Sequence, residues 1–201
     1  ASLATGMWPH EIGSLANATP FDGREKTYAH YLKNNDIEPA SIGKLDFKPN
    51  CKHGFDSQLE APRKTPDIGE FLRDPISQRV GGYRKRVWET EIFAEDKEAS
   101  PVNEICSWLD DHSHCNHPWH LFASFTLPHP PFKVPEKYFK LYDVDETKVP
   151  EITDDYIVNL HKAMKLHRHH WNVLEGFPEE DVRYKKTIYY AMVTWLDDMI
   201  G

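Results

Sequence analysis

The stretch LFASFTLPHPPF, residues 121–132, is the part of the sequence that decides the fold. Its apolar first half has the composition of a buried strand, which we expect over 119–126. The prolines of PHPP then stop the strand, because proline fixes φ and donates no backbone hydrogen bond. His129 would thus sit just beyond the carboxyl end of a strand, where ligands bind in open α/β sheets. Taken alone, the stretch fits an ordinary proline turn with a surface histidine better than it fits a ligand-binding histidine.

The helix expected just upstream of this strand makes half of a βαβ-type unit, which is typical of α/β folds. Apolar spacing predicts helices over 24–34, 100–110, 135–142 and 150–171, and a long helix that starts at Pro178. Strands are expected over 39–42 and 119–126, with another strand or hairpin within 84–93. Residues 45–83 show little periodicity and predict a long loop with a short helix near 68–72.

Local signals predict where two helices begin or end. Gly6 follows a helical segment at 1–4 and is expected to close it in the left-handed conformation. In the helix at 100–110, Ser100 has the chemistry of an N-cap and Pro101 that of the first helical residue. The apolar stripe of that helix is expected to comprise Val102, Ile105, Cys106 and Leu109.

Size and charge exclude several classes of function. The chain has 201 residues, which suits one domain, and a formal net charge of −8, which argues against nucleic acid as the main partner. No apolar run approaches the roughly 20 residues of a membrane-spanning helix, so no membrane partner is expected. Three cysteines do not make a disulfide framework and favour a reducing compartment. The compartment stays open between cytoplasm and periplasm, and an oligomer is compatible with the sequence.

Two histidine-rich segments could be taken for metal sites. Residues 110–120 hold two aspartates, a cysteine and several histidines, and zinc binds such side chains. The segment has no pair of cysteines at zinc-site spacing, however, so a solvated helix-to-strand loop is the preferred interpretation. The second segment, HRHH at 167–170, is interpreted as a polar helix face. We therefore predict no metal ligands within this chain.

Gly43-Lys44 directly follows the strand expected over 39–42. Glycine lets a backbone approach a ligand closely, and lysine supplies a compact positive charge to an oxyanion. Asp46 is close enough in sequence to pair with Lys44, which would make this an ordinary surface ion pair.

Six segments in order resemble the motifs of the sulfatase family. They are ASLATG at 1–6, WPHEIG at 8–13, the segment 27–44 ending in GK, HGFD at 53–56, the stretch 121–132, and YYAMVTWLDDMIG at 189–201. The first resembles the sequence that follows the C-x-P-S-R nucleophile motif. In the last, Asp197 stands at the aspartate of the family's L-D-x-x-I-G motif. The sequences AHYL, HGFD and LPHPPF are most similar to those of choline-sulfatase-like enzymes, whereas GKLD resembles the sequence of arylsulfatase-K-like enzymes. We therefore predict that residues 1–201 are the central part of a sulfatase N-terminal catalytic domain, an internal fragment of a longer chain.

The resemblance implies an alkaline-phosphatase-like three-layer sandwich, here incomplete, with a central sheet flanked by helices. It implies hydrolysis of a small-molecule sulfate ester by a formylglycine nucleophile and a Ca²⁺ ion, both held outside this chain. Lys44 would contact a sulfate oxygen, and His129 would contact the sulfate or the leaving oxygen. Such roles place charge and a proton where the reaction needs them. Asn17 and Asp46 are the expected substrate-binding residues.

Departures from the family pattern keep alternatives open. Many sulfatases read G-K-x-H where this chain has Asp46, which removes one usual cation. A phosphonate monoester hydrolase or phosphodiesterase of the same superfamily would share the P-H-P-F wording. A catalytically inactive sulfatase-like binding module and a histidine-rich metal-binding protein are the other candidates. Because the nucleophile motif is not among these residues, we expect no sulfatase turnover from the 201 residues alone.

Overall fold

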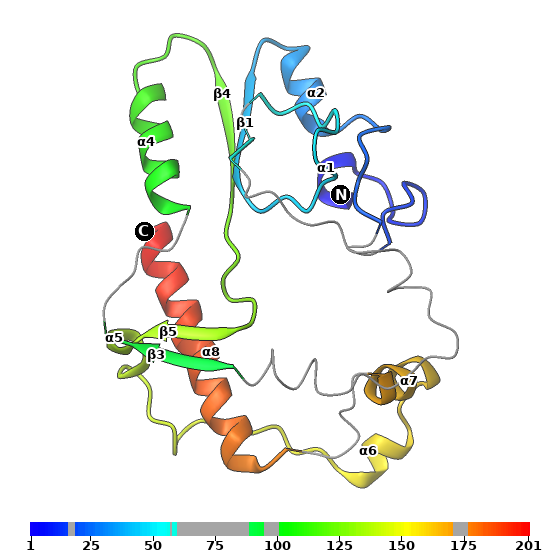
Figure 1. Ribbon diagram of the computed structural model, residues 1–201, viewed down its shortest axis with the longest axis vertical. Coiled ribbons are helices and arrows are strands. Elements are labelled where there is room, and N and C mark those ends of the chain that lie inside the picture. The colour runs from blue at the N-terminus through cyan, green and yellow to red at the C-terminus, as the bar shows by residue number, and fades with distance from the viewer. Residues whose placement is uncertain (16–18, 57, 60–88, 95–100, 171–176) are drawn as a thin grey trace. The chain divides into compact units, whose positions relative to one another are not determined.

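The computed structural model describes residues 1–15, 19–56, 58–59, 89–94, 101–170 and 177–201 (Figure 1). The chain divides into two compact units, which are described one at a time. The first comprises Ala1–Arg73 and Glu98–Thr126, and the second comprises Asp74–Lys97 and Leu127–Gly201. The strand of the stretch 121–132 therefore belongs to the first unit, and its proline turn belongs to the second.

A small parallel sheet organises the first unit. Its strands are β1 (Glu38–Gly43), β2 (Gln58–Leu59) and β4 (Trp119–Ser124), in the order β2-β1-β4. The four inner residues of β1 are buried, as expected for the middle strand of a parallel sheet. Parallel pairing of β1 with β4 aligns Gly43 with Ser124, so both strands end at the same edge.

Helices cover both faces of this sheet. Trp108 of α4 (Val102–His112) meets Trp119 edge-on, with ring centroids 5.0 Å apart. Tyr28 of α2 (Tyr28–Lys33) meets the next residue of β4, His120, at 5.3 Å. Successive side chains of a strand point to opposite faces, so α4 and α2 pack on opposite sides, as Figure 1 also shows. The expected arrangement of a sheet flanked by helices is present in this unit.

The core of the first unit lies on the α2 side of the sheet. Phe21, Ala29, Phe47 and Phe55 are buried there together with Ala4 of α1 (Ser2–Thr5). Phe21 and Phe47 also join two loops through an isolated parallel bridge and a ring contact of 5.0 Å. Gly6 closes α1 with a φ of 72°, as predicted.

The long C-terminal helix organises the second unit. Helix α8 (Glu179–Ile200) begins after Pro178, as predicted, with three acidic residues in its first turn. It packs on α5 (Glu136–Phe139) and on β5 (Phe132–Pro135), which pairs in parallel with β3 (Thr90–Phe93). Val134, Ile188, Met192 and Trp195 are buried in the resulting core.

The single helix expected over 150–171 is wrong, because the chain forms α6 (Asp154–Val158) and α7 (Lys162–His170) instead. Capping side chains explain the break. Thr153 accepts a hydrogen bond from the Tyr156 amide at the start of α6, and His161 Nδ1 accepts one from the Ala163 amide at the start of α7. Each cap starts a new helix, and α6 ends at Val158 before α7 begins at Lys162.

Helix α4 also differs from its expected form. Pro101 occupies the N-cap rather than the first helical position. The half-buried stripe consists of Val102, Ile105, Trp108 and His112, whereas Cys106 and Leu109 are exposed. The stripe is shifted because Trp108 stacks on His112 and packs against Trp119 of the sheet.

Strand β2 lies within the segment 45–83, which was expected to be a loop, and the expected N-cap Ser100 lies outside the described residues. Other expectations agree in kind and differ at their ends. Strand β4 stops at Ser124, two residues early, and the helix expected over 24–34 forms over Tyr28–Lys33. The short helix expected near 68–72 lies outside the described residues.

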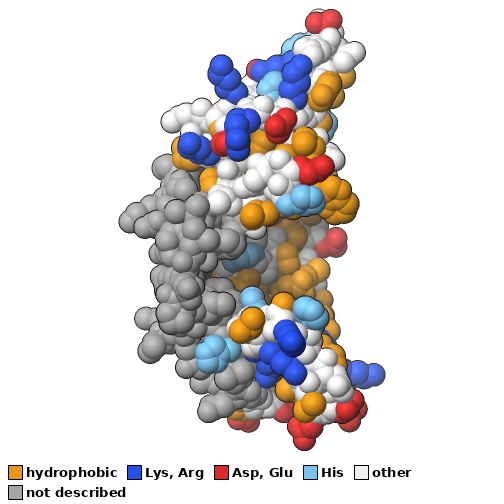
Figure 2. Space-filling view, turned by 90° about the vertical axis from the view of Figure 1, so that its right-hand side faces the viewer, with side chains coloured by type: hydrophobic (Ala, Val, Ile, Leu, Met, Phe, Trp, Pro, Cys, Tyr) orange, Lys and Arg blue, Asp and Glu red, His pale blue; other side chains and the backbone are white. Residues whose placement is uncertain are grey.

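No helix in the described part of the chain is both long and apolar enough to cross a bilayer. On the face drawn in Figure 2, charged side chains of both signs are mixed with exposed hydrophobic ones.

Candidate functional site

The edge where β1 and β4 end depends on a close approach of two backbones. Gly43 has a φ of 97°, and a Cβ atom on it would lie 1.9 Å from the carbonyl oxygen of Ser124. The same carbonyl accepts a hydrogen bond of 3.3 Å from the Lys44 amide. Only glycine fits at this point, so the turn that carries Lys44 is anchored to the end of the neighbouring strand.

Lys44 and Asp46 form an ion pair just beyond β1. Lys44 Nζ lies 3.3 Å from Asp46 Oδ2, and both side chains are partly exposed. Asp46 adopts a left-handed φ of 56°, which turns the chain after Lys44. The predicted neighbours are therefore together, and Asp46 offsets part of the positive charge that Lys44 would present to an anion.

The HGFD segment packs against α2 near this edge and contributes Phe55 to the pocket beside Lys44. Thr27 and His30 form a capping box at the start of α2, with His30 Nδ1 accepting from the Thr27 amide at 3.0 Å. The Thr27 hydroxyl donates to the His53 carbonyl at 2.6 Å. Gly54, with a φ of 89°, lies so close that a Cβ would be 2.8 Å from His30 Nδ1. The segment thereby fastens α2 to the loop after β1.

A pocket of about 120 Å³ opens beside Lys44. Four aromatic side chains form much of its wall: Tyr28, Phe47, Phe55 and Phe122. Aliphatic residues of α1, its preceding residue Ala1, and Leu45 complete the apolar lining, while Lys44 and Ser124 bring polar groups. We call this cavity the Lys44 pocket; it lies entirely within the first unit.

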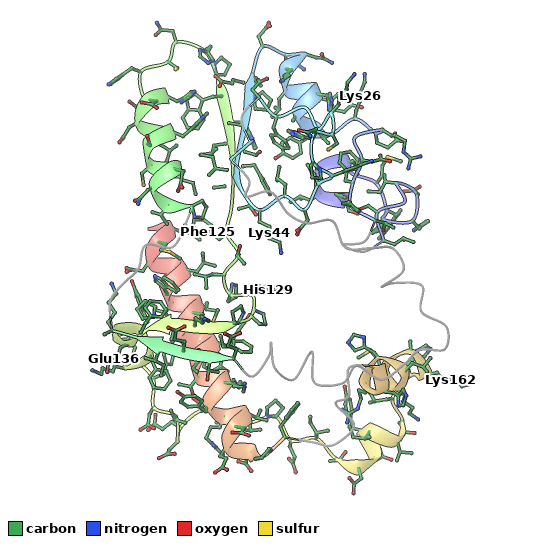
Figure 3. The ribbon with its side chains drawn as sticks, viewed as in Figure 1. Lys26, Lys44, Phe125, His129, Glu136 and Lys162 are labelled. Carbon is green, nitrogen blue, oxygen red and sulfur yellow. The ribbon has the colours of Figure 1, made fainter. Side chains whose placement is uncertain are left out.

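His129 occupies the turn before β5 (Figure 3), as the prolines predicted, and its side chain is exposed. Its Nδ1–H donates to the carbonyl oxygen of Pro130 at 2.6 Å. This bond holds the ring and keeps a proton on Nδ1, so Nε2 is the nitrogen that can meet a ligand. Both X-Pro bonds at Leu127-Pro128 and Pro130-Pro131 are cis.

The predicted site residues fall in different places. Lys44 and Asp46 lie together in the first unit, and His129 lies in the second. That Lys44 and His129 share one sulfate stays a prediction. Asn17 lies outside the described residues.

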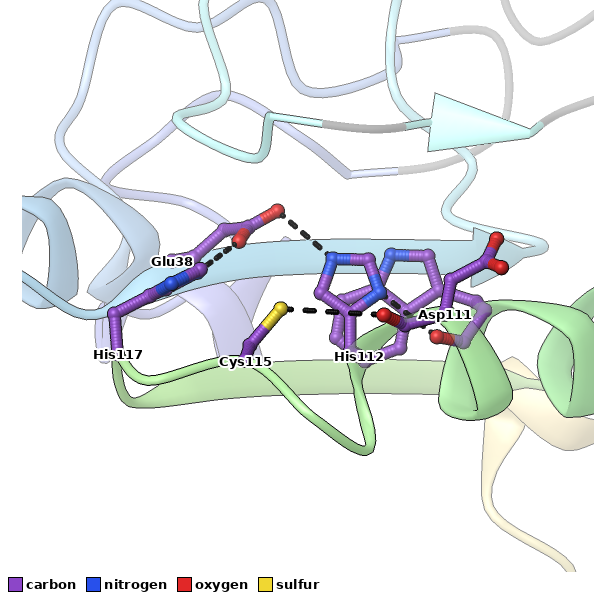
Figure 4. Close-up of polar contacts among 6 residues, drawn as sticks. Glu38, Asp111, His112, Cys115 and His117 are labelled. Atoms are coloured by element: carbon purple, nitrogen blue, oxygen red, sulfur yellow. Dashed lines mark hydrogen bonds and ion pairs between the residues drawn. The ribbon is translucent and has the colours of Figure 1, made fainter.

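The histidine-rich connection between α4 and β4 is organised by one carboxylate (Figure 4). Glu38 accepts from His117 Nε2 at 2.7 Å and lies 3.5 Å from His112 Nε2. The hydrogen bond from His117 is the main reason why the pKa of Glu38 lies below its ordinary value. His112 donates from Nδ1 to the Trp108 carbonyl at 2.8 Å. These contacts tie the end of α4 to the start of β1.

The contacts around Glu38 do not amount to a metal site. Within the described residues, no three His, Cys, Asp or Glu side chains form a group that could hold a metal ion. The described residues therefore do not fit a calcium ion on their own.

Several residues of the Lys44 pocket were not foreseen as site residues. Tyr28 appeared only as an apolar position of a helix, and Ser124 only as part of a strand. The pairing of Gly43 with Ser124 is a tertiary contact for which the sequence has no local signal. The aromatic wall could have been noticed from the phenylalanines of GKLDF and HGFD, which flank the expected loop.

Comparison with known proteins identifies what the chain resembles. No family model matches it. It is 27% identical to a choline-sulfatase of Rhizobium meliloti strain 1021 over 222 residues, and 21% identical to arylsulfatase K of Bos taurus over 215 residues. Both matches cover the whole chain, which spans 42% and 38% of the length of those enzymes. The resemblance to sulfatases drawn from the six segments is confirmed.

Solved structures show the fold. The whole chain superposes on 47% of a phosphonate monoester hydrolase of Agrobacterium radiobacter, with a TM-score of 0.68 at 21% identity. The predicted fold class, part of the alkaline-phosphatase-like architecture, is confirmed.

Proposed function

We propose that this chain is the central part of the catalytic domain of a sulfuric ester hydrolase that acts on a small-molecule sulfate ester. The observation that carries the proposal is Lys44, which lies just beyond the carboxyl end of β1 and lines a pocket with an aromatic wall. Ala1, the residue that the resemblance puts directly after the nucleophile motif, lines the same pocket. A cation and the expected position of the nucleophile segment therefore occur at one sheet edge.

Lys44 and His129 have complementary roles in this proposal. Lys44 donates to a sulfate oxygen, where its charge stabilises the negative charge that develops during sulfur–oxygen cleavage. His129, with Nδ1–H bound to the Pro130 carbonyl, presents Nε2 and in its protonated form supplies a proton to the leaving oxygen. Neither role needs a residue that the described structure lacks.

Asp46 favours a singly charged ester. Its carboxylate is 3.3 Å from Lys44 Nζ, so it weakens the attraction of this edge for a dianion more than for a monoanion. A sulfate monoester carries one negative charge, whereas a phosphate monoester carries close to two at neutral pH. Asp46 is thus proposed as a substrate-binding residue that selects by charge, and Asn17 as a second substrate-binding residue.

The nucleophile and the metal are proposed from the family alone. A formylglycine would supply the attacking oxygen, and a Ca²⁺ ion would neutralise sulfate oxygens, with both provided by segments outside these 201 residues. The relatives extend well beyond the matched part, which leaves room for such segments.

The proposal is tested by turnover of the complete gene product that contains this chain. We expect hydrolysis of 4-nitrophenyl sulfate, with kcat reduced about 10²- to 10³-fold by Lys44→Met and by a comparable factor in His129→Gln. Lys48→Met is the matched control, since Lys48 is an exposed lysine of the same loop and is absent from the pocket lining. Unchanged turnover in Lys44→Met would refute the role of Lys44.

A phosphonate monoester hydrolase is the second candidate, because the superposition on such an enzyme covers the whole chain. Phosphonate monoesters are also singly charged, so the charge of Asp46 does not distinguish between a sulfatase and a phosphonate monoester hydrolase. A higher kcat/KM for 4-nitrophenyl phenylphosphonate than for 4-nitrophenyl sulfate would favour this alternative. Absence of turnover with both esters would favour an inactive sulfatase-like binding module.

A further inference from the structure

The corner where α4 ends and β1 begins holds an imidazole between two hydrogen-bond acceptors (Figure 4). His112 Nδ1 lies 2.8 Å from the carbonyl oxygen of Trp108, and His112 Nε2 lies 3.5 Å from Oε1 of Glu38. A carbonyl oxygen and an ionised carboxylate can only accept hydrogen bonds. A neutral imidazole has one N–H and can donate to one of these groups, whereas the doubly protonated ring can donate to both.

Two further features of this corner favour a positive charge on His112. It is the last residue of α4, where the helix dipole places partial negative charge. Its ring stacks on the indole of Trp108 with centroids 3.7 Å apart, and the face of an indole attracts a cation. Because the side chain of His112 is only 19% exposed, solvent screens these attractions in part.

The second imidazole at Glu38 has different requirements. His117 Nε2 donates to Oε2 of Glu38 at 2.7 Å, which a neutral ring can also do. The side chain of His117 is 51% exposed, so water can reach the ring. The contact of Glu38 that requires a second proton on the imidazole is therefore the one with His112.

Four other titratable residues lie next to His112 in the sequence. Asp110 and Asp111 precede it in the last turn of α4, whereas His114 and Cys115 follow it, and all four are exposed. The two carboxylates add to the negative potential around His112, and a charged His114 opposes it, but each of these effects is screened by solvent. Glu38 is the partly buried charge that faces the ring.

We propose that His112 and Glu38 form a pH-dependent switch that fastens the end of α4 to the start of β1. The doubly protonated His112 bridges the Trp108 carbonyl and Glu38, and loss of the proton from Nε2 releases the carboxylate. The inference is independent of the proposed function, since none of these residues lines the Lys44 pocket or belongs to the turn that holds His129.

The contact needs an ionised Glu38 together with a protonated His112. It is therefore strongest between the ordinary titration ranges of carboxyl and imidazole groups, at roughly pH 5–6, and is lost as pH rises above about 7. The lowered pKa of Glu38, caused first by the hydrogen bond from His117, keeps the carboxylate ionised at the acid end of this window.

The test is hydrogen exchange, followed by mass spectrometry, of the complete gene product in peptides that span residues 105–118. His112→Phe keeps a ring against Trp108 and removes both nitrogens. It should speed exchange relative to wild type by a factor about three times larger at pH 5.5 than at pH 8. In a Glu38→Gln background this pH dependence should disappear. His114→Phe is the matched control, because His114 is an exposed histidine of the same connection, and it should change exchange equally little at both pH values.

Three results would overturn the inference. The same factor at both pH values would mean that His112 acts by packing alone. A pH dependence that survives in the Glu38→Gln background would mean that another acidic group, such as Asp111, is the partner. The third result is independent of any His112 variant: ¹⁵N NMR of histidine-labelled wild type should show protons on both ring nitrogens of His112 at pH 5.5 and on one at pH 8. A nitrogen without a proton at pH 5.5 would contradict the proposal.

Discussion

At the scale of single residues, glycines place the candidate site more firmly than its charged side chains do. Gly43 and Gly54 both have positive φ, and both lie where a Cβ would meet a neighbour closer than 3 Å. The first joins β1 to β4 beside Lys44, and the second joins HGFD to His30 of α2. The glycines that this chain shares with the sulfatase motifs at these positions therefore have a direct structural role.

Replacing Gly43 tests this reason. Gly43→Ala should lower the free energy of unfolding by at least about 2 kcal/mol, because the added Cβ would meet the Ser124 carbonyl, a backbone atom that cannot rotate away. Gly6→Ala is the matched control, with a similar positive φ of 72° and nothing within 4 Å of the added Cβ. It should cost only about 1 kcal/mol. Urea denaturation measures both, and equal losses would show that the contact with Ser124 is unimportant.

Also at the scale of single residues, Glu38 makes a pH-dependent contribution to the free energy of unfolding. Because its pKa is lowered in the folded chain, the unfolded chain binds more protons between the two values. The stabilisation is thus complete above the ordinary carboxyl pKa and is lost as pH falls through the lowered one. Glu38→Gln should cost roughly 0.5–1 kcal/mol near pH 6 and progressively less as pH falls below the ordinary carboxyl pKa, as measured by urea denaturation. A loss that persists unchanged at pH 3 would contradict this account.

At the scale of elements, helix-capping residues and strand composition were the signals that predicted helices and strands most successfully. The helix closed by Gly6, the strand before Gly43 and the helix after Pro178 form where the sequence indicates. The break between α6 and α7 was missed because the basic composition of 162–170 masked the cap at His161. The shifted stripe of α4 was missed because Trp119, its packing partner, lies on another element.

The helix α8 contains a lysine whose charge is disfavoured by its surroundings. Desolvation lowers the pKa of Lys185 to about 8, with its Nζ 5.9 Å from the ring centre of Phe132. The folded chain therefore binds fewer protons than the unfolded chain between about pH 8 and the ordinary lysine pKa, so stability should rise with pH through that window.

Lys185→Met removes the cost of burying this charge. After allowance for screening by solvent, the variant should be about 1 kcal/mol more stable than wild type at pH 7, with the difference shrinking towards pH 10. Lys186→Met is the control on the neighbouring position, where Lys186 donates to the Lys148 carbonyl, and it should not stabilise. Thermal unfolding at both pH values measures the effect, and a destabilised Lys185→Met would contradict it.

At the scale of the whole molecule, the sequence predicted the fold class and the sulfatase resemblance because both depend on the order of short segments. The residue pairings within the candidate site could not be predicted in the same way. The contact of Lys44 with the end of β4 joins residues about 80 positions apart in the sequence, and the aromatic wall of the pocket also combines distant segments. That Lys44 and His129 act on one sulfate is a proposal about residues equally far apart in the sequence, and the resemblance alone supports it.

The most direct measurement is a crystal structure of the complete gene product with sulfate bound. The proposal predicts one sulfate that accepts hydrogen bonds of about 3 Å from both Lys44 Nζ and His129 Nε2, with Asp46 beside Lys44. A sulfate bound elsewhere, or Lys44 and His129 too far apart for one sulfate to reach both, would contradict it.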